Sequence, residues 1–357
     1  MNKVRRVTLH TIAKQVGVSA TTISRVLSGQ AARYRISKST EETVLQAAAE
    51  LGYLPDQLAR GLRIKRTHTI GLIIPDISNP FFSTLARNIE IEARKAGYSI
   101  ILSDIQEETQ LEVESTRLLQ SRKVEGLIIC PAGEQSEHLK AILRIELPMV
   151  IVDRHFPELE CPYVVSDNYK GSFEAVSYFI ENNHRIIAFI QGRLHTSVNN
   201  DRVRGYRDAL KKHNIPFDEA FIVGDSFGER NGYVGAKMLL NRASRPTAII
   251  AASNLISLGA MRAIYEEGLK IPDEISMISF DDQPYSDYLA TPMTTVAQQT
   301  TEMGQIAFKL LMSQINLERP RDTEGVVLST ELKIRKSVKK LEPAFMKETK
   351  EETFIGA

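Results

Sequence analysis

Residues 69–97 read TIGLIIPDISNPFFSTLARNIEIEARKAG, an apolar run that passes through a short polar segment into a stretch with helical spacing of its apolar residues. A strand followed by an amphipathic helix is the repeating unit of a parallel sheet covered by helices. Comparable apolar runs recur along the chain as SIILSD (99–104), GLIICPA (126–132), MVIVDR (149–154), IIAFIQG (186–192), AIIAAS (248–253) and SMISFDD (276–282).

This alternation occurs twice, over about 70–167 and about 170–295, and a shorter run, TTVAQ (294–298), follows. Each repeat is long enough to form its own layered sheet and core. We therefore expect two α/β lobes with a cleft between them.

Polar and aromatic side chains stand mainly where these apolar runs end. Ligands of open α/β sheets bind beyond the carboxyl ends of the strands, so these positions are candidates for a ligand site. Aromatic rings that cover the C–H face of a sugar, with carboxylate, amide and guanidinium groups for its hydroxyls, suit a sugar ligand. The candidate residues are Asn79, Phe81, Phe82, Asp153, Arg154, Arg202, Phe227, Asn254, Asp281 and Gln298.

Simpler roles remain open for some of these residues. Asp153 and Arg154 could pair only with each other, and Phe81 could be an ordinary core residue. The adjacent carboxylates Asp281 and Asp282 could suggest acid catalysis, but the sequence offers no Ser/His/Asp set, phosphate loop or metal cluster around them. We therefore expect no enzymatic activity, no cofactor and no metal site.

The charge of the chain is unevenly distributed. Residues 1–66 carry 12 Lys and Arg against four Asp and Glu, so their formal charge is +8 within a total of +1, which leaves −7 for the remainder. A basic head on a mildly acidic body favours a polyanionic partner for the head alone, although a solvated basic face would have the same composition.

Other classes of protein are disfavoured by the sequence. It has no run of eighteen apolar residues, and the apolar residues near the N-terminus are spaced rather than continuous, so we expect neither a membrane span nor a signal peptide. The two cysteines, Cys130 and Cys161, lack the spacing of a zinc site. A reducing cytoplasm is the expected compartment.

Residues 9–28 read LHTIAKQVGVSATTISRVLS and predict two short amphipathic helices. Gly17 lies between them, where a tight turn needs a positive φ, and Ser19 is placed to cap the second helix. This spacing is typical of a helix-turn-helix, whose second helix enters the major groove of DNA. An ordinary helical hairpin is the alternative.

The exposed face of the second helix carries the candidate DNA contacts. Arg25 could donate to a guanine, and the methyl group of Ala20 or Thr21 could touch a thymine methyl. Thr22 and Ser24 are better placed for phosphates, which position the protein without specifying a sequence. Thr8 and Ser19 complete the candidate set in this region.

A third helix is predicted over about 38–51, with Val44, Leu45, Ala48 and Leu51 on one face. After Pro55, Asp56 can cap a short helix over 57–63. Leu62 lies there among arginines, where it could wedge between base pairs of the minor groove while flanking basic residues such as Arg60 hold phosphates. Packing of Leu62 on the head is the alternative.

Three motifs in order, VSATTISRVLSG (18–29), YLPDQLARGL (53–62) and IGLIIPDISNPFF (70–82), resemble the lactose-repressor family of bacterial transcription regulators. The resemblance covers residues 7 to about 337. It implies a body with the fold of type I periplasmic binding proteins, in which the chain crosses between lobes more than once. It also implies that Ala20, Thr21 and Arg25 read bases, that Leu62 is the hinge leucine, and that Ala59 packs against the second hinge helix in the groove.

The candidate ligand residues match ligand positions of the ribose-binding relatives, except that Ser253-Asn254 replaces the usual Asn-Asp pair. Two further departures concern DNA. Asp56 stands where the family usually has Asn, which places a negative charge beside phosphate. The loop GQAARYRIS (29–37) is longer than usual, and its Arg33 and Arg35 could add phosphate contacts.

The sequence thus predicts a small all-α helix-turn-helix head and a two-lobed α/β body of parallel sheets. We expect a homodimeric repressor that binds a near-palindromic operator in double-stranded DNA, is controlled by a small sugar or sugar phosphate, and does not contact membranes. A sugar-binding transport protein, or a regulator with a different effector, is the competing reading. The predicted divisions are a head of 1–55, a hinge of 56–66, a first lobe of about 67–168 and 298–327, a second lobe of about 169–297 and 328–337, and a disordered tail of 338–357.

Overall fold

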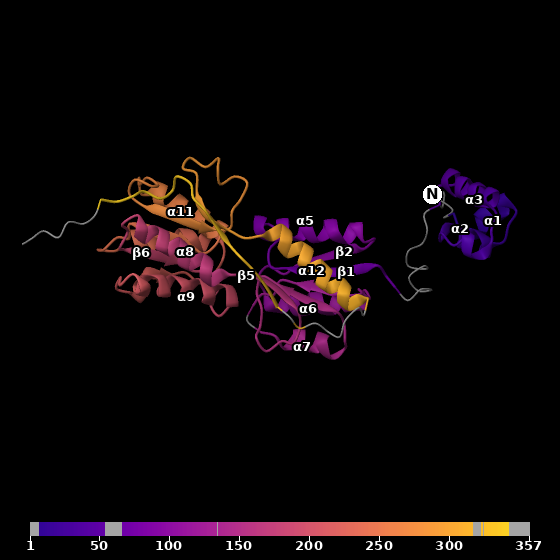
Figure 1. The fold of residues 1–357 in the computed structure, drawn as a ribbon, viewed down its shortest axis with the longest axis horizontal. Helices are drawn as coiled ribbons and strands as arrows, with labels where there is room; N and C mark the ends of the chain where they lie inside the picture. The colour runs from indigo at the N-terminus through magenta and orange to yellow at the C-terminus, as the bar shows by residue number, and fades with distance from the viewer. Residues whose placement is uncertain (1–6, 54–65, 134, 317–322, 324, 343–357) are drawn as a thin grey trace, which may run out of the picture. The chain divides into compact units, whose positions relative to one another are not determined.

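The computed structural model describes residues 7–53, 66–133, 135–316, 323 and 325–342. The chain divides into two compact units, Met1–Thr67 and His68–Ala357, named here the head and the body (Figure 1). Among the described residues, no helix is both long enough and apolar enough to cross a bilayer. Asp56, Ala59, Arg60 and Leu62 lie outside the described residues, so the hinge helix remains a prediction.

The head is a bundle of short helices around one apolar core. Gly17 ends the first helix with φ 78°, as the turn requires, and Ser19 caps the second by accepting a hydrogen bond from the Thr22 amide at 3.0 Å. The elements are α1 (Leu9–Val16), α2 (Ala20–Leu27), the 3-10 helix η1 (Ala32–Tyr34) and α3 (Lys38–Glu50).

The prediction for one residue on the apolar face of α3 is wrong. Leu45 is 48% exposed, whereas Val44, Ala47 and Ala48 are buried. On a helix with 3.6 residues per turn, positions 44, 47, 48 and 51 share one face, and Leu45 lies about 100° away from Val44. Ala47, rather than Leu45, therefore completes the buried face of this helix.

The first lobe of the body is a six-stranded parallel sheet in the order β11-β5-β4-β3-β1-β2. Helices α5 and α12 pack together against one core of this lobe, and α6 and α7 pack against another. The elements are β1 (Thr69–Ile74), α5 (Pro80–Lys95), β2 (Ser99–Asp104), α6 (Thr109–Ser121), β3 (Leu127–Ile129), α7 (Glu137–Arg144), β4 (Met149–Val152), β5 (Tyr163–Ser166), α12 (Thr300–Ile315) and β11 (Gly325–Leu328).

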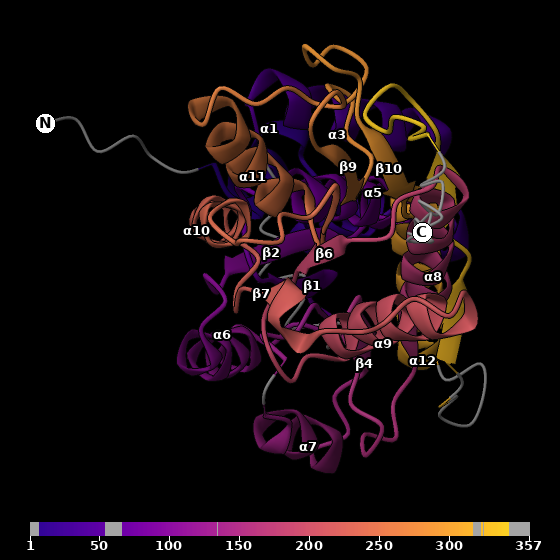
Figure 2. The ribbon, with the colours of Figure 1, turned by 90° about the vertical axis from the view of Figure 1, so that its left-hand side faces the viewer.

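The second lobe repeats this plan in the strand order β12-β10-β9-β8-β6-β7, with only β12 antiparallel among its described strand pairs. Helices α8 and α9 pack together, as do α10 and α11, which lie side by side in Figure 2. The elements are α8 (Asn168–Glu181), β6 (Ile187–Ile190), α9 (Ser197–Lys212), η2 (Glu219–Phe221), β7 (Ile222–Val223), α10 (Glu229–Leu240), β8 (Ala248–Ala251), α11 (Asn254–Glu266), β9 (Ser276–Phe280), β10 (Thr294–Ala297) and β12 (Glu331–Lys333).

The chain passes between the lobes three times, after β5, after β10 and after β11. Because all three connections leave the same end of the lobes, the carboxyl ends of both parallel sheets face a common space. The expected disorder from residue 338 is wrong for its first residues. The Leu341 amide donates to the Asn182 carbonyl at 3.0 Å, and His184 bonds the Lys339 carbonyl at 2.9 Å, so 338–342 belong to the second lobe.

Candidate functional sites

The carboxyl ends of the strands surround one small cavity in the body. Its lining contains every predicted ligand residue except Asn254, and adds Val198 and Ser253. The volume of about 20 Å³ admits about one water molecule, so this cavity is too small for a sugar in this structure. The lining residues are Asn79, Phe81, Phe82, Asp153, Arg154, Val198, Arg202, Phe227, Ser253, Asp281 and Gln298.

Two buried carboxylates face this cavity, one from each lobe. Asp153 follows β4 and Asp281 follows β9, and they are only 5% and 6% exposed. Burial raises the pKa of Asp153 to about 6 although Arg154 and Arg202 oppose the shift. Burial also raises the pKa of Asp281, against the opposing effects of Arg202, Gln298 and the Asn254 amide. Neither carboxylate is fully compensated by the protein.

Arg154 is held by a residue that the sequence did not reveal. Its guanidinium donates to both carboxylate oxygens of Glu107 at 2.6 Å, and to the carbonyls of Pro131 and Ala132 at 3.1 and 2.8 Å. Burial alone would lower the pKa of Arg154, but Glu107 outweighs it and raises the pKa. The Asp153 carboxylate lies farther away, 3.7 Å from Nε, so a simple Asp153–Arg154 pair is the wrong description.

Arg202 lies within α9, which begins at Ser197, rather than at the start of a helix. Its Nε donates to Asn168 Oδ1 at 2.8 Å, another Arg202 nitrogen donates to the Ala252 carbonyl, and its guanidinium lies 3.9 Å from the Phe280 ring centroid. Burial lowers the pKa of Arg202, against the opposing charges of Asp281 and Asp153. Both cleft arginines are therefore already engaged by the protein.

Three aromatic rings complete the lining. Phe81 and Phe82 meet edge to face at 5.0 Å, and both belong to the core of the first lobe as well as to the cavity wall. Phe227 lies in a loop and packs over Gly192, where a Cβ would come within 2.1 Å of the ring. The two roles considered for Phe81, core and cavity, thus coincide.

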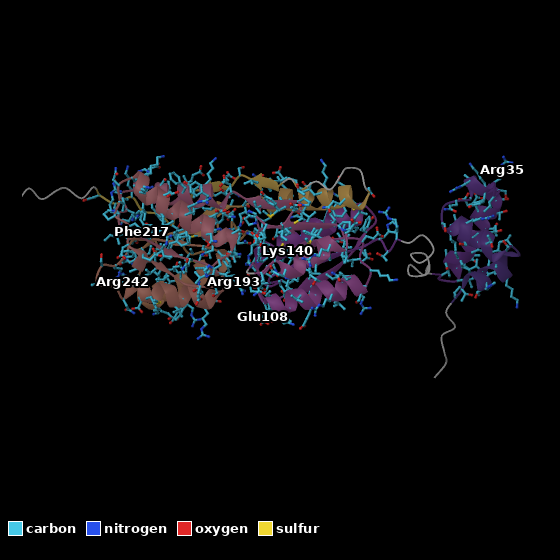
Figure 3. The ribbon with its side chains drawn as sticks, turned by 90° about the horizontal axis from the view of Figure 1, so that it is seen from below. Arg35, Glu108, Lys140, Arg193, Phe217 and Arg242 are labelled. Carbon is cyan, nitrogen blue, oxygen red and sulfur yellow. The ribbon has the colours of Figure 1, made fainter. Side chains whose placement is uncertain are left out.

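Direct contacts join the lobes around the closed cleft. The Asn254 side chain donates to Asn79 Oδ1 at 3.0 Å, and the His155 amide donates to Ser197 Oγ at 3.1 Å. Arg193, labelled at the junction of the lobes in Figure 3, donates to the Glu107 carbonyl. Asn254 is absent from the cavity lining and contacts Asn79 instead, so its role as a ligand residue stays a prediction.

Two polar atoms of the lining lack a hydrogen-bond partner, Arg154 Nε and Gln298 Oε1. The other end of the Gln298 amide donates to Asp281 Oδ1 at 2.6 Å. A buried polar atom without a partner costs free energy, which a bound polar ligand would recover. The cavity is thus chemically suited to a ligand with several hydrogen-bonding groups.

The neighbouring carboxylate of Asp282 has a different environment. It pairs with Lys333 at 2.9 Å and with Arg335 at 2.8 Å. Burial alone would raise the pKa of Asp282, but hydrogen bonds from these residues and Thr295 outweigh it and lower the pKa. Asp282 is therefore engaged by cations, whereas Asp281 lines the cavity. Among the residues described, no cluster of three His, Cys, Asp or Glu could hold a metal ion.

The head presents its second helix as the sequence predicts. Thr21 is exposed, and Ala20 and Arg25 are partly exposed. The hydroxyls of Thr8 and Ser19 cap α1 and α2, and Thr22 Oγ1 lies 2.9 Å from Ser19 Oγ, so these hydroxyls have partners within the head. The Arg25 guanidinium lies 3.8 Å from the Tyr34 ring centroid, a contact that the sequence did not reveal.

Comparison with known proteins agrees with this arrangement. The family described as bacterial regulatory proteins, lacI family, matches residues 8–56, and that described as periplasmic binding proteins and sugar binding domain of LacI family matches 67–337. The HTH-type transcriptional regulator DegA of Bacillus subtilis is 32% identical over 94% of this chain and 99% of its own. The ribose operon repressor of Haemophilus influenzae is 32% identical over 86% of this chain and 92% of its own length.

A solved structure of the lac repressor dimer bound to operator and the anti-inducer ONPF aligns with a TM-score of 0.84 at 26% identity, over 94% of this chain and 100% of that one. Both the head and the body are therefore shared with these regulators, in the same order. The chain belongs to the LacI family of bacterial regulatory proteins.

Proposed function

We propose that this DNA-binding transcription regulator acts as a homodimeric repressor whose affinity for a near-palindromic operator is controlled by a small uncharged sugar in the cleft. The observation that carries this proposal is the pair of incompletely compensated carboxylates, Asp153 and Asp281, that face a cavity walled by aromatic rings. Sugar hydroxyls donate hydrogen bonds to carboxylates, and rings cover the apolar face of a sugar.

The charges around the cleft favour a neutral ligand over a phosphorylated one. Arg154, Arg193 and Arg202 are balanced by Glu107, Asp153 and Asp281, and Arg154 is already bound by both oxygens of Glu107. A phosphate would bring up to two further negative charges beside two buried carboxylates. Of the two effector classes that the sequence predicts, the unphosphorylated sugar therefore fits better.

The closed cleft suggests how the ligand could act. Because the cavity admits about one water molecule, a sugar must enter an open form and be enclosed as the lobes approach. The ligand then shifts the balance between open and closed forms by its difference in affinity for them. In a dimer, this shift would move the first lobes relative to each other and bias the order of the hinge segment that contains Leu62.

A thermal-shift screen of the full chain against pentoses, hexoses and their phosphates tests the proposal. At about a hundred times its dissociation constant, the effector should add roughly 2.7 kcal/mol to the free energy of unfolding. Asp281→Asn should abolish the shift, whereas Asp282→Asn, which alters a carboxylate engaged by Lys333 and Arg335, should retain it. Stabilisation by sugar phosphates alone would contradict the neutral-ligand assignment.

Two other functions are less well supported. A transport protein would have no use for the head, which matches the DNA-binding family over residues 8–56. Catalysis would require a reactive group, and Asp282 is held by two cations. Incubation of any sugar hit with the protein, followed by NMR of the sugar, should show no turnover.

A further inference from the structure

Arg25 does not extend freely from the second helix of the head. Its guanidinium carbon lies 3.8 Å from the centroid of the Tyr34 ring, while that of Arg33 lies at 6.0 Å, the outer limit of such a contact. The planar guanidinium group is the part of Arg25 that would fork onto a guanine. The ring of Tyr34 therefore restricts this group.

The loop that carries Tyr34 is anchored to the helix that carries Arg25. The Gln30 amide donates to the Arg25 carbonyl at 2.9 Å, and the Tyr34 amide donates to the Gln30 carbonyl at 3.2 Å. Ala31 is only 2% exposed, so its methyl group fixes the loop to the head core. These bonds place η1 beside the end of α2.

Tyr34 has no evident role in the stability of the head. Its side chain is 42% exposed, and it is absent from the apolar core formed by α1, α2 and α3. A large aromatic side chain on the surface, held by a well-bonded loop, requires another explanation. Its contact with Arg25 supplies one.

We propose that Tyr34 is a specificity-positioning residue: its ring holds the Arg25 guanidinium in the orientation that reads a base pair. This inference rests on the base-reading role of Arg25 in the proposed function. Stacking on an aromatic face limits the many conformations of a long arginine side chain before DNA arrives. Less entropy is then lost when the guanidinium binds a base edge, and the wrong base is rejected more strongly.

The test is selection of binding sites from random duplex DNA with the full chain, followed by affinity measurement on the selected operator and on single-base variants of it. The proteins are wild type, Arg25→Ala, Tyr34→Phe and Tyr34→Leu. Phe keeps the ring without the hydroxyl, and Leu keeps apolar bulk without the ring. Tyr34→Leu should reduce discrimination at the Arg25-dependent base pair by about two- to fivefold, while Tyr34→Phe leaves it unchanged.

A structural readout accompanies the binding data. In the DNA-free protein, the NMR signal of the Arg25 Nε proton should be shifted upfield by the ring in wild type and in Tyr34→Phe, but not in Tyr34→Leu. Circular dichroism should show equal helix content in all four proteins, because Tyr34 lies outside the head core.

The outcomes distinguish the base-reading role of Arg25 from the positioning role of Tyr34. If Arg25→Ala changes no base preference, the base-reading role itself is wrong. If Arg25→Ala removes a preference that Tyr34→Leu leaves intact or strengthens, Arg25 reads DNA without help from Tyr34, and the present inference is overturned. An equal loss of affinity for every sequence in Tyr34→Leu would also overturn it, by marking Tyr34 as a general DNA contact.

Discussion

Asp153 and Asp281 hold equivalent positions in the two lobes. Each directly follows the strand that lies third in its sheet, β4 or β9, and their φ angles are 69° and 70°. The left-handed region costs most non-glycine residues about 1–2 kcal/mol, although Asp tolerates it better than most. The shared backbone conformation directs both carboxylates into one cavity, so the two lobes contribute matched halves of the site.

The stability of the protein should depend on pH through Asp153. Its pKa is about 6 in the folded state and 3.8 ordinarily, so between these values the unfolded chain releases a proton that the folded protein retains. The Asp153 contribution to the free energy of unfolding therefore falls as pH rises from about 4 to about 6, by at most about 3 kcal/mol. Urea unfolding of wild type and Asp153→Asn at several pH values measures it, and parallel curves would contradict the assignment.

Glu107→Gln should destabilise the first lobe. The substitution leaves the buried charge of Arg154 without its carboxylate, and removal of one partner from a buried pair costs about 3 kcal/mol. The exposed neighbour offers a matched control, because Glu108→Gln should change the free energy of unfolding by less than about 0.5 kcal/mol. Denaturant titration measures the free energy of unfolding of both variants. Equal stability would show that the buried charge of Arg154 does not need the Glu107 carboxylate.

Gly259→Ala should disrupt the packing of α10 on α11. A Cβ at this position would lie 1.9 Å from the Glu229 carbonyl oxygen, so the helices would have to move apart at a cost of about 1–3 kcal/mol or more. Gly228→Ala is the control, since nothing lies within 4 Å of its added Cβ. Thermal melting should show a lower midpoint only for Gly259→Ala; a comparable loss at both sites would show that close packing at Gly259 is not its cause.

Leu62→Ala should weaken operator binding and leave sugar binding intact. The prediction rests on sequence, where one leucine among arginines suits a minor-groove wedge, and the residue lies outside the described part of the chain. Fluorescence anisotropy with the selected operator measures the first effect, and the thermal shift caused by the sugar measures the second. Unchanged operator affinity would exclude the wedge.

The parts of the fold that the sequence predicts are those with a strong local signal. Buried strands such as β1 and β4 consist almost entirely of apolar residues, and the polar residues that follow them, including Asn79 and Asp153, are identifiable for that reason. The strands β7 and β12 have two and three residues, which is too short for a distinct apolar run, and β11, which reads GVVL, is partly exposed. They exist because neighbouring strands offer backbone hydrogen bonds.

Contacts between residues that lie far apart along the chain could not be predicted from the sequence. Glu107 binds Arg154 across 47 positions from a loop with φ 60°, and Asn168 binds Arg202 across 34, with no periodic pattern to connect them. Tyr34 differs from Glu107 and Asn168, because the unusual length of its loop, residues 29–37, can be read from the sequence. The sequence predicts phosphate contacts there for the charged residues Arg33 and Arg35, whereas the aromatic side chain between them is the one that contacts Arg25.

The three passages of the chain between the lobes have a consequence for protein engineering. The first lobe is assembled from residues on both sides of the second, so no single cut yields either lobe whole. A chimera that exchanges one lobe between relatives must join the chains at three points, after β5, β10 and β11.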